Sequence, residues 1–345
     1  MLTDFDRPME ICVNIEILPA HEGDCIFVAI VSNDGIYNIM IDSGVKTTYQ
    51  FRDRKQRFKD GPLKVKINEL REMHQKIDLL ILTHVDEDHL GGIVEWIAKD
   101  ETALDMIGTI LMNNGDQIPV PDYSSLLHSI PKGRNLDKLL RDEHKAVVNQ
   151  IVKGKVFDVP HGKITILTPT VTFHNVIAEK WNGGVLHKTP ADYGKPIKAL
   201  LEYNFTEKDE SKTNNSSISF VLETDGRKDL FLGDADIDEV CLSLDELGYS
   251  NEHPLCCKTV KLSHHGSRKN FSSRLLELVK AEVFIFSTNG DYYGHPDKEV
   301  LAQIIDKTCA KVYFNYKDRF EKILCEQDLV EYPDIKNRII DNLNG

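Results

Sequence analysis

Histidine and acidic residues follow directly on several apolar runs of this sequence. The stretch ILTHVDEDHLGG, residues 81–92, places two histidines and three acids behind an apolar run and closes with a glycine pair. Further polar residues follow other apolar runs at Asp42, Asp234, His264, His265 and His295. Imidazole and carboxylate groups without thiolates suit zinc, manganese or iron. The pattern therefore indicates a metal site assembled from segments that lie far apart in the chain.

Two clusters of such ligands, with one carboxylate able to bridge, suit a pair of divalent ions roughly 3.5–4 Å apart. Such a pair shares a hydroxide and clamps a displacement at carbon or phosphorus. Each segment alone has an ordinary alternative. Asp88 could cap a helix, Asp234 could belong to a plain turn, and His295 could be a simple turn histidine. Because these residues follow several separate strands, their combination favours the metal site.

Strands are predicted before each of these polar groups. An N-terminal meander covers residues 11–44, with turns at residues 21–24 and 33–35. Later strands are predicted over residues 76–83, 106–114, 161–170, 256–262 and 281–290, with a hairpin turn at Asp225 and Gly226. A helix is predicted over residues 91–100. Polar side chains at the carboxyl ends of strands are typical of sites in α/β proteins.

The length of 345 residues and a hydrophobic content of 41% predict one large domain spanning residues 1–345. We expect insertions at about 45–75, 113–160 and 171–211, and a C-terminal extension at about 315–345. That extension contains helix and strand fragments with an exposed helical end, where a protein partner could dock.

The net charge of −13 argues against a protein that coats nucleic acid with its whole surface. Residues 45–66 are the exception, with eight Lys or Arg against two Asp. Lys46 and Arg52 are therefore candidate contacts to a phosphate backbone, although a solvated charged loop explains the same composition. Tyr293, beside His295, could stack a base or simply pack.

No apolar run of about 18 residues and no leader peptide are apparent, so we expect a cytoplasmic chain with no membrane contact. The seven cysteines are odd in number and lack paired spacing. This favours free thiols in a reducing compartment.

The stretch ILTHVDEDHLGG resembles the THxHxDHxGG signature of the metallo-β-lactamase fold, with Asp86 where the family most often has histidine. The chain also resembles the metallo-β-lactamase-type domain of the ComEC competence proteins and their free-standing relatives. This resemblance rests on that aspartate together with the EGD turn, IDSG, NNSSISFVLETDGRKDLFLGD, LSHHGS and YGHP. The resemblance runs in order from about residue 11 to 305. It implies the α/β class, as a metallo-β-lactamase αββα sandwich with insertions.

The resemblance also implies a set of metal ligands for two divalent ions, zinc or manganese. His84 and Asp86 would hold one ion, Asp88 and His89 would help hold the second, and Asp234 would bridge them. Either His264 or His265 would complete the second site.

A further family histidine is missing, because NNSS at residues 214–217 occupies its place. The first site would then be one ligand short, weakly occupied, and suited to an ion that accepts oxygen ligands, such as manganese. Asp42 and Asn215 would orient ligands without binding metal. Asp88 would also orient or deprotonate the attacking water, and His295 would contact substrate.

The resemblance implies hydrolysis of phosphodiesters by a metal-activated hydroxide, as in a nuclease. Two alternatives remain open. The acidic surface suits a hydrolase of small esters, lactones or phosphoesters. The missing histidine suits a metal-binding interaction module without turnover.

Overall fold

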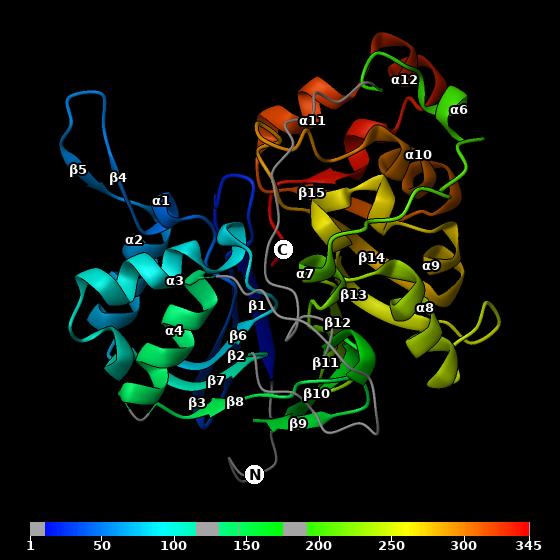
Figure 1. Ribbon diagram of the computed structural model, residues 1–345. Helices are drawn as coiled ribbons and strands as arrows, with labels where there is room; N and C mark the ends of the chain where they lie inside the picture. Colours follow the sequence, from blue (N-terminus) through cyan, green and yellow to red (C-terminus); the bar gives the residue numbers. More distant parts are fainter. Residues whose placement is uncertain (1–10, 115–130, 144, 175–191, 345) are drawn as a thin grey trace, which may run out of the picture.

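In the computed structural model, two mixed β-sheets lie face to face and helices cover the outer face of each sheet (Figure 1). The structure describes residues 11–114, 131–143, 145–174 and 192–344. The four layers confirm the predicted αββα sandwich.

The first sheet has the strand order β1-β2-β3-β6-β7-β8. Its strands are β1 (Cys12–Ile17), β2 (Ile26–Ser32), β3 (Gly35–Ile41), β6 (Ile77–Leu82), β7 (Ile107–Met112) and β8 (Val147–Val148). The strands β1 to β3 form the predicted antiparallel meander, and β3, β6, β7 and β8 pair in parallel. Strand β1 alternates exposed and buried residues, whereas β6 is almost continuously apolar, as expected of a central parallel strand covered on both faces.

The second sheet has the order β16-β15-β14-β13-β12-β11-β10-β9. Its strands are β9 (Val156–Val159), β10 (Gly162–Thr168), β11 (Ser219–Thr224), β12 (Arg227–Phe231), β13 (Leu255–Lys261), β14 (Val279–Phe286), β15 (Lys311–Phe314) and β16 (Ile339–Ile340). The turn between β11 and β12 has positive φ at Asp225 (41°) and Gly226 (79°), which the predicted Asp-Gly hairpin requires.

Three apolar clusters hold the layers together. One fills the space between the sheets, with side chains such as Ile15, Ile81, Phe220 and Ile285. A second lies under α2 (Pro62–Glu72), α3 (Glu87–Lys99) and α4 (Pro131–Asp142). The third lies under α8 (Ile237–Glu246), α9 (Ser273–Leu278) and α10 (Lys298–Lys307). Each outer helix therefore buries its apolar stripe on one sheet.

Short elements make up the rest of the described chain. In the predicted first insertion lie α1 (Lys46–Tyr49), β4 (Gln50–Arg52) and β5 (Phe58–Asp60). Elsewhere are α6 (Ile197–Leu200), α7 (Lys212–Asn215), α11 (Lys317–Ile323) and α12 (Glu326–Glu331). The 3-10 helices are η2 (Ala103–Met106), η3 (Ser263–Gly266), η4 (Arg268–Asn270) and η5 (Ile335–Arg338). Parts of the insertions expected at 113–160 and 171–211 lie outside the described residues, and the one-domain organisation stays a prediction.

The C-terminal segment contains the predicted helix and strand fragments, but it does not end on a helix. An exposed helical end was expected, but after α12 the chain adds β16 to the edge of the second sheet. Asn344 then exchanges two hydrogen bonds with the backbone of Ile15 in β1, at 2.8 and 3.0 Å. The terminal segment therefore contacts both sheets. No helix in the described ranges is long and apolar enough to cross a bilayer.

Candidate metal centre

The seven residues predicted to bind metal gather where strand ends of the two sheets meet. His84 to His89 follow β6 in the first sheet, while Asp234 follows β12 and the histidine pair follows β13 in the second. Beside them the backbone N–H of Ile218, just before β11, donates to the carbonyl of Thr83, just after β6, at 2.9 Å, which joins the two sheets at strand ends. The site is thus assembled across the sandwich.

Asp234 lies at the centre of two groups of side chains. In the first group, Nε2 of His84 lies 3.8 Å from Oδ2 of Asp234 and 3.9 Å from Oδ2 of Asp86. Nε2 of His264 also lies 3.8 Å from Oδ2 of Asp234. This group therefore contains two imidazoles, one carboxylate of its own and the shared Asp234.

The second group repeats this composition. Nε2 of His89 lies 3.5 Å from Asp234 and 3.8 Å from Oδ2 of Asp88. Nε2 of His265 lies 3.7 Å from the same oxygen of Asp88 and 3.8 Å from Oδ1 of Asp234. The two neighbouring histidines 264 and 265 therefore face different groups.

Four atoms that face the centre are buried, and none of them has a hydrogen-bond partner among the described residues. They are the Nε2 atoms of His84, His89 and His265 and Oδ1 of Asp234. Donor atoms of a four-coordinate ion, at about 2.0–2.2 Å from the metal, lie about 3.3–3.6 Å from one another. The observed separations are close to this spacing, and buried polar atoms rarely lack partners. The residues present therefore fit divalent metal ions.

Each imidazole is oriented through its other nitrogen. The Nδ1–H of His89 donates to Asp42 at 2.8 Å, and that of His265 donates to the carbonyl of Ser287 at 2.8 Å. Nδ1 of His84 lies 3.0 Å from Oγ of Ser217. These bonds leave the Nε2 lone pairs directed at the centre.

His264 is oriented by a carboxylate that sequence analysis did not identify. Its Nδ1–H lies 3.0 Å from Oδ2 of Asp209 and 2.9 Å from Oδ1 of Asn270. The backbone of both histidines is left-handed, with φ of 44° at His264 and 56° at His265. Two consecutive non-glycine residues in this region store strain, which is typical of functional sites. This backbone conformation directs the two imidazole rings toward different groups of side chains around Asp234.

The start of α3 settles whether the acids serve as helix caps. The helix begins at Glu87, four residues earlier than predicted, so the N-cap is Asp86 and Asp88 lies in the first turn. Asp86 makes no side-chain cap bond and instead accepts a hydrogen bond from Thr213 at 3.0 Å. The capping alternative for Asp88 is therefore wrong, because its carboxylate faces His89 and His265.

Burial and mutual charge shift the pKa values of these groups strongly. Burial, helped by His89, lowers the pKa of His84 to about 3. Burial and the neighbouring Asp88 raise the pKa of Asp86 to about 7. For His264, burial opposes the charged form, but Asp234 and Asp209 raise its pKa to about 9. Titratable groups whose pKa values are shifted in opposite directions within one cluster are characteristic of functional sites.

The remaining predicted residues lie around the centre at different depths. The ring of His295 lies 4.9 Å from that of His264, and the ring of Tyr293 lies 6.4 Å away. Asn215 donates to the carbonyl of Asp209 rather than contacting a histidine. Lys46 is exposed in α1, and Arg52 is exposed in β4, stacked 4.3 Å over the Phe58 ring.

Sequence reasoning did not identify several residues that contact the histidines, among them Asp24, Asp209 and Ser217. Asp24 is buried, forms an ion pair with Lys261 and lies 3.5 Å from Nδ1 of His265. Its oxygen also lies within 4.8 Å of ligand atoms of His89, His265 and Asp234. The EGD turn carried a signal for it, since an acid follows a strand there. Asp209 and Ser217 have no such signal, because only tertiary packing brings them to the site.

The comparisons with known proteins agree with this architecture. Residues 20–187 match the profile of the Metallo-beta-lactamase superfamily. The chain is 22% identical to ComE operon protein 3 of Bacillus subtilis (strain 168) over 304 residues, covering 86% of this chain. It spans 31% of that relative's length.

Solved structures with a similar arrangement are more distant. The metallo-beta-lactamase fold protein YhfI from Bacillus subtilis is 10% identical, with a TM-score of 0.41 and coverage of 94% of this chain and 92% of that one. CmlA, a diiron beta-hydroxylase from Streptomyces venezuelae, is 12% identical, with a TM-score of 0.42 and coverage of 96% and 52%.

Proposed function

From the premise that this chain carries a metallo-β-lactamase superfamily domain, we propose that it is a metal-dependent hydrolase of phosphodiester bonds. Members of the superfamily are mostly metal-dependent hydrolases. The observation that carries the proposal is the convergence of buried, unpartnered imidazole nitrogens on Asp234. Such groups are stable when a cation satisfies them.

Two divalent ions, zinc or manganese, would bind in this arrangement. His84, Asp86 and His264 would hold the first, Asp88, His89 and His265 the second, and Asp234 would serve both. On this assignment His264 takes the place of the histidine missing from residues 214–217, so the first site has a full set of ligands. Imidazole and carboxylate ligands in equal numbers accommodate either metal.

The ions, when bound, would provide a hydroxide nucleophile at neutral pH and neutralise charge on the attacked group. The chain's own residues do the rest. Asp88 accepts the proton of the attacking water or holds that water in position. His295, whose ring lies 4.9 Å from that of His264, contacts the substrate at the entrance, beside Tyr293.

The preference for phosphodiesters rests on the motif resemblance and on local charge. The α1 helix packs on the first turns of α3. Its residue Lys46 is exposed, so this lysine could pair with a phosphate bound near the metal centre. An ester or lactone would gain nothing from that lysine. The small-molecule alternative therefore remains a competing outcome of the experiment below.

The test combines metal analysis with hydrolysis assays on the metal-loaded protein. We expect about two equivalents of zinc or manganese, and hydrolysis of both bis-p-nitrophenyl phosphate and an oligonucleotide. In His84→Ala we expect about one equivalent and a loss of activity of on the order of 100-fold or more. His253→Ala, at an exposed turn histidine, is the matched control and should behave as wild type.

The alternatives have distinct results. Hydrolysis of esters or lactones without phosphodiester turnover would favour the small-molecule hydrolase. Two bound ions without any turnover would favour an interaction module. Absence of stoichiometric metal would refute the assignment of the centre.

A further inference from the structure

The hairpin formed by β4 and β5, residues 50–60, projects from the molecule beside α1 and α2 (Figure 1). Its five cations are Arg52, Arg54, Lys55, Arg57 and Lys59, against two acids, Asp53 and Asp60. A protein with a net charge of −13 therefore carries a cationic projection at one place. Local cationic projections attract anionic polymers even when the net charge is negative.

Several of these cations are free to bind an anion. Arg57 pairs with Asp53, and Lys64 pairs with Asp60. Within the described ranges, no ion pair involves Arg54, Lys55 or Lys59, and all three are exposed. The turn is pre-organised, since Oδ1 of Asp53 accepts the backbone N–H groups of Lys55 and Arg57 at 2.8 and 3.0 Å.

The hairpin also exposes aromatic rings on its two faces. The register pairs Arg52 with Phe58 and Phe51 with Lys59, so each face carries one ring and one cation. Phe58 is 54% exposed and Phe51 is 39% exposed. Cations interleaved with exposed rings are the combination that binds unpaired bases and their phosphates.

The hairpin lies against α3, the helix whose first turn carries Asp88 and His89. The α1 helix at its base packs on α3, where a Cβ at Gly91 would lie 2.6 Å from the backbone nitrogen of Lys46. At the other end of α3, Lys99 donates to Gln50 at 2.9 Å and lies 4.6 Å over the Phe58 ring. Ten residues of helix separate His89 from Lys99, about 15 Å. A strand lying along α3 would span this distance with several nucleotides.

We propose that the hairpin of residues 50–60 binds the backbone of single-stranded nucleic acid several nucleotides away from the bond that the metal centre cleaves. The inference rests on the proposed phosphodiesterase function. It adds that substrate length matters: a long strand reaches both the hairpin and the metal centre, whereas a small phosphodiester reaches the metal centre alone.

The test removes the three free cations in the variant Arg54→Ala, Lys55→Ala, Lys59→Ala. We expect this variant to bind a fluorescent 20-nucleotide oligothymidylate about 10- to 100-fold more weakly at 0.1 M salt. The slope of log affinity against log salt should fall by about 2, at roughly 0.7 for each lost phosphate contact. Hydrolysis of bis-p-nitrophenyl phosphate should stay at the wild-type rate.

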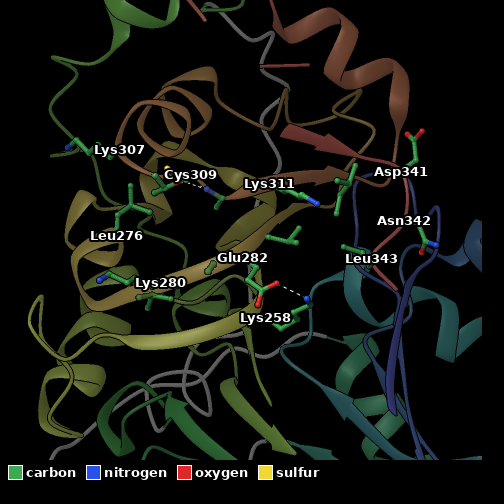
Figure 2. A pocket seen from close by; sticks show the side chains of 16 residues that line it. Lys258, Leu276, Lys280, Glu282, Lys307, Cys309, Lys311, Asp341, Asn342 and Leu343 are labelled. Atoms are coloured by element: carbon green, nitrogen blue, oxygen red, sulfur yellow. Dashed lines mark hydrogen bonds and ion pairs between the residues drawn. The ribbon is translucent and has the colours of Figure 1, made fainter. Parts of the chain in front are cut away.

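The matched control is Lys280→Ala, Lys307→Ala, Lys311→Ala, which removes the same charge elsewhere. These lysines line a cavity of about 880 Å³ beside β14 and β15, and none of its lining residues belongs to the metal centre (Figure 2). The control should bind the oligonucleotide as wild type does. Binding is read on the metal-loaded protein, with a gel confirming an intact strand.

Three outcomes separate the possibilities. Wild-type affinity in the hairpin variant, or an equal loss in the control, would overturn the inference. A loss of affinity equal for duplex and single strand would overturn the preference for unpaired bases. If wild type hydrolyses neither substrate yet the hairpin variant alone loses binding, the proposed function fails while the hairpin still binds nucleic acid.

Discussion

Asp42 illustrates how single residues prepare this centre. Its carboxylate is fully buried after β3 and accepts three hydrogen bonds, from Nδ1–H of His89 at 2.8 Å and from the N–H and hydroxyl of Thr83 at 2.8 and 2.7 Å. Burial raises the pKa of Asp42, partly offset by His89. The bond to His89 selects the tautomer whose Nε2 lone pair faces Asp234, and an imidazole oriented in this way is a stronger ligand.

Replacing Asp42 by alanine should therefore weaken metal binding without removing a ligand. We expect Asp42→Ala to lower metal affinity by about 10- to 100-fold, as measured by competition with a chromogenic chelator. Asp78→Ala provides the control, since Asp78 accepts the N–H of Asn38 on the same sheet and forms no hydrogen bond or ion pair with a histidine in the described part of the chain. Unchanged affinity in Asp42→Ala would contradict the orienting role.

At the residue scale, the sequence indicated candidate site residues where a polar side chain comes directly after a predicted strand. His84, Asp234 and the pair His264 and His265 follow strands, so the sequence pattern made them candidates, and the family resemblance combined them into one ligand set. Asp209 and Ser217 reach their histidines only through packing between distant segments, and no periodicity reports that. The separate directions of His264 and His265 depend on left-handed backbone at both residues, which the dipeptide alone does not specify.

At the scale of elements, the glycine pair of α3 sets how closely the helix approaches the Asp42 segment. A Cβ at Gly92 would lie 2.1 Å from the carbonyl oxygen of Ser43. Replacing Gly92 by alanine would raise the helix propensity by about 1 kcal/mol. Overpacking against the backbone typically costs about 1–3 kcal/mol, and it would also displace the start of the helix. Backbone atoms move little to relieve such a contact. We therefore expect the unfavourable contact with Ser43 to outweigh the gain in helix propensity.

We therefore expect Gly92→Ala to lower the free energy of unfolding by about 1–2 kcal/mol, measured by urea titration of the apoprotein. Gly194→Ala is the matched control, because a Cβ there would meet no heavy atom within 4 Å. It should lie within about 0.5 kcal/mol of wild type. A stabilised Gly92→Ala would show that the segment can move aside.

The other end of α3 is fixed by Asp100. Its carboxylate pairs with Arg71 of α2 at 2.6 Å and accepts a hydrogen bond from Nε1 of Trp96 at 3.0 Å. Burial raises the pKa of Asp100, but the bonds from Arg71, Thr102 and Trp96 outweigh it and lower the pKa to about 2. Because the folded pKa is depressed, the stabilisation is complete above the unfolded pKa of about 4 and is lost as pH falls toward 2.

Asp100→Asn should accordingly cost about 1–2 kcal/mol of unfolding free energy at pH 7, with allowance for partial solvent exposure. The difference from wild type should shrink between pH 4 and pH 2, as measured by urea titrations at several pH values. A difference that stays constant over this interval would assign the effect to packing instead of charge.

The elements themselves were predictable to different degrees. Apolar runs identified β1 to β3, β6 and β7 of the first sheet and β10 to β14 of the second, whereas the shorter β8, β9 and β15 were not predicted. The start of α3 was placed four residues late, since the helix begins with three polar residues in a row, Glu87, Asp88 and His89, which give no apolar period. Strand fragments were predicted in the C-terminal segment without bounds, because a two-residue edge strand such as β16 leaves no pattern that fixes its position.

At the scale of the whole molecule, the residues of the candidate metal centre come from both sheets. His84, Asp86, Asp88 and His89 come from the loop and helix after β6 in the first sheet. Asp234, His264 and His265 come from the second sheet. In the absence of metal, three carboxylates and four imidazoles from opposite sheets must satisfy one another. Bound ions would therefore hold the two halves of the sandwich together, and binding would stabilise the native state alone.

Metal addition should consequently raise the melting temperature of the chelator-treated protein. At free metal 100 times the Kd, linkage gives about 2.7 kcal/mol, or a rise of roughly 3–8 °C for a chain of this size. Asp234→Ala removes the ligand common to both groups, so its rise should fall below about 2 °C in differential scanning calorimetry. Equal rises in the two proteins would mean that metal stabilises the chain elsewhere. A metal-dependent rise in melting temperature that occurs only in the wild type would instead show that metal stabilises the sandwich through Asp234, one of the seven side chains that we propose as metal ligands.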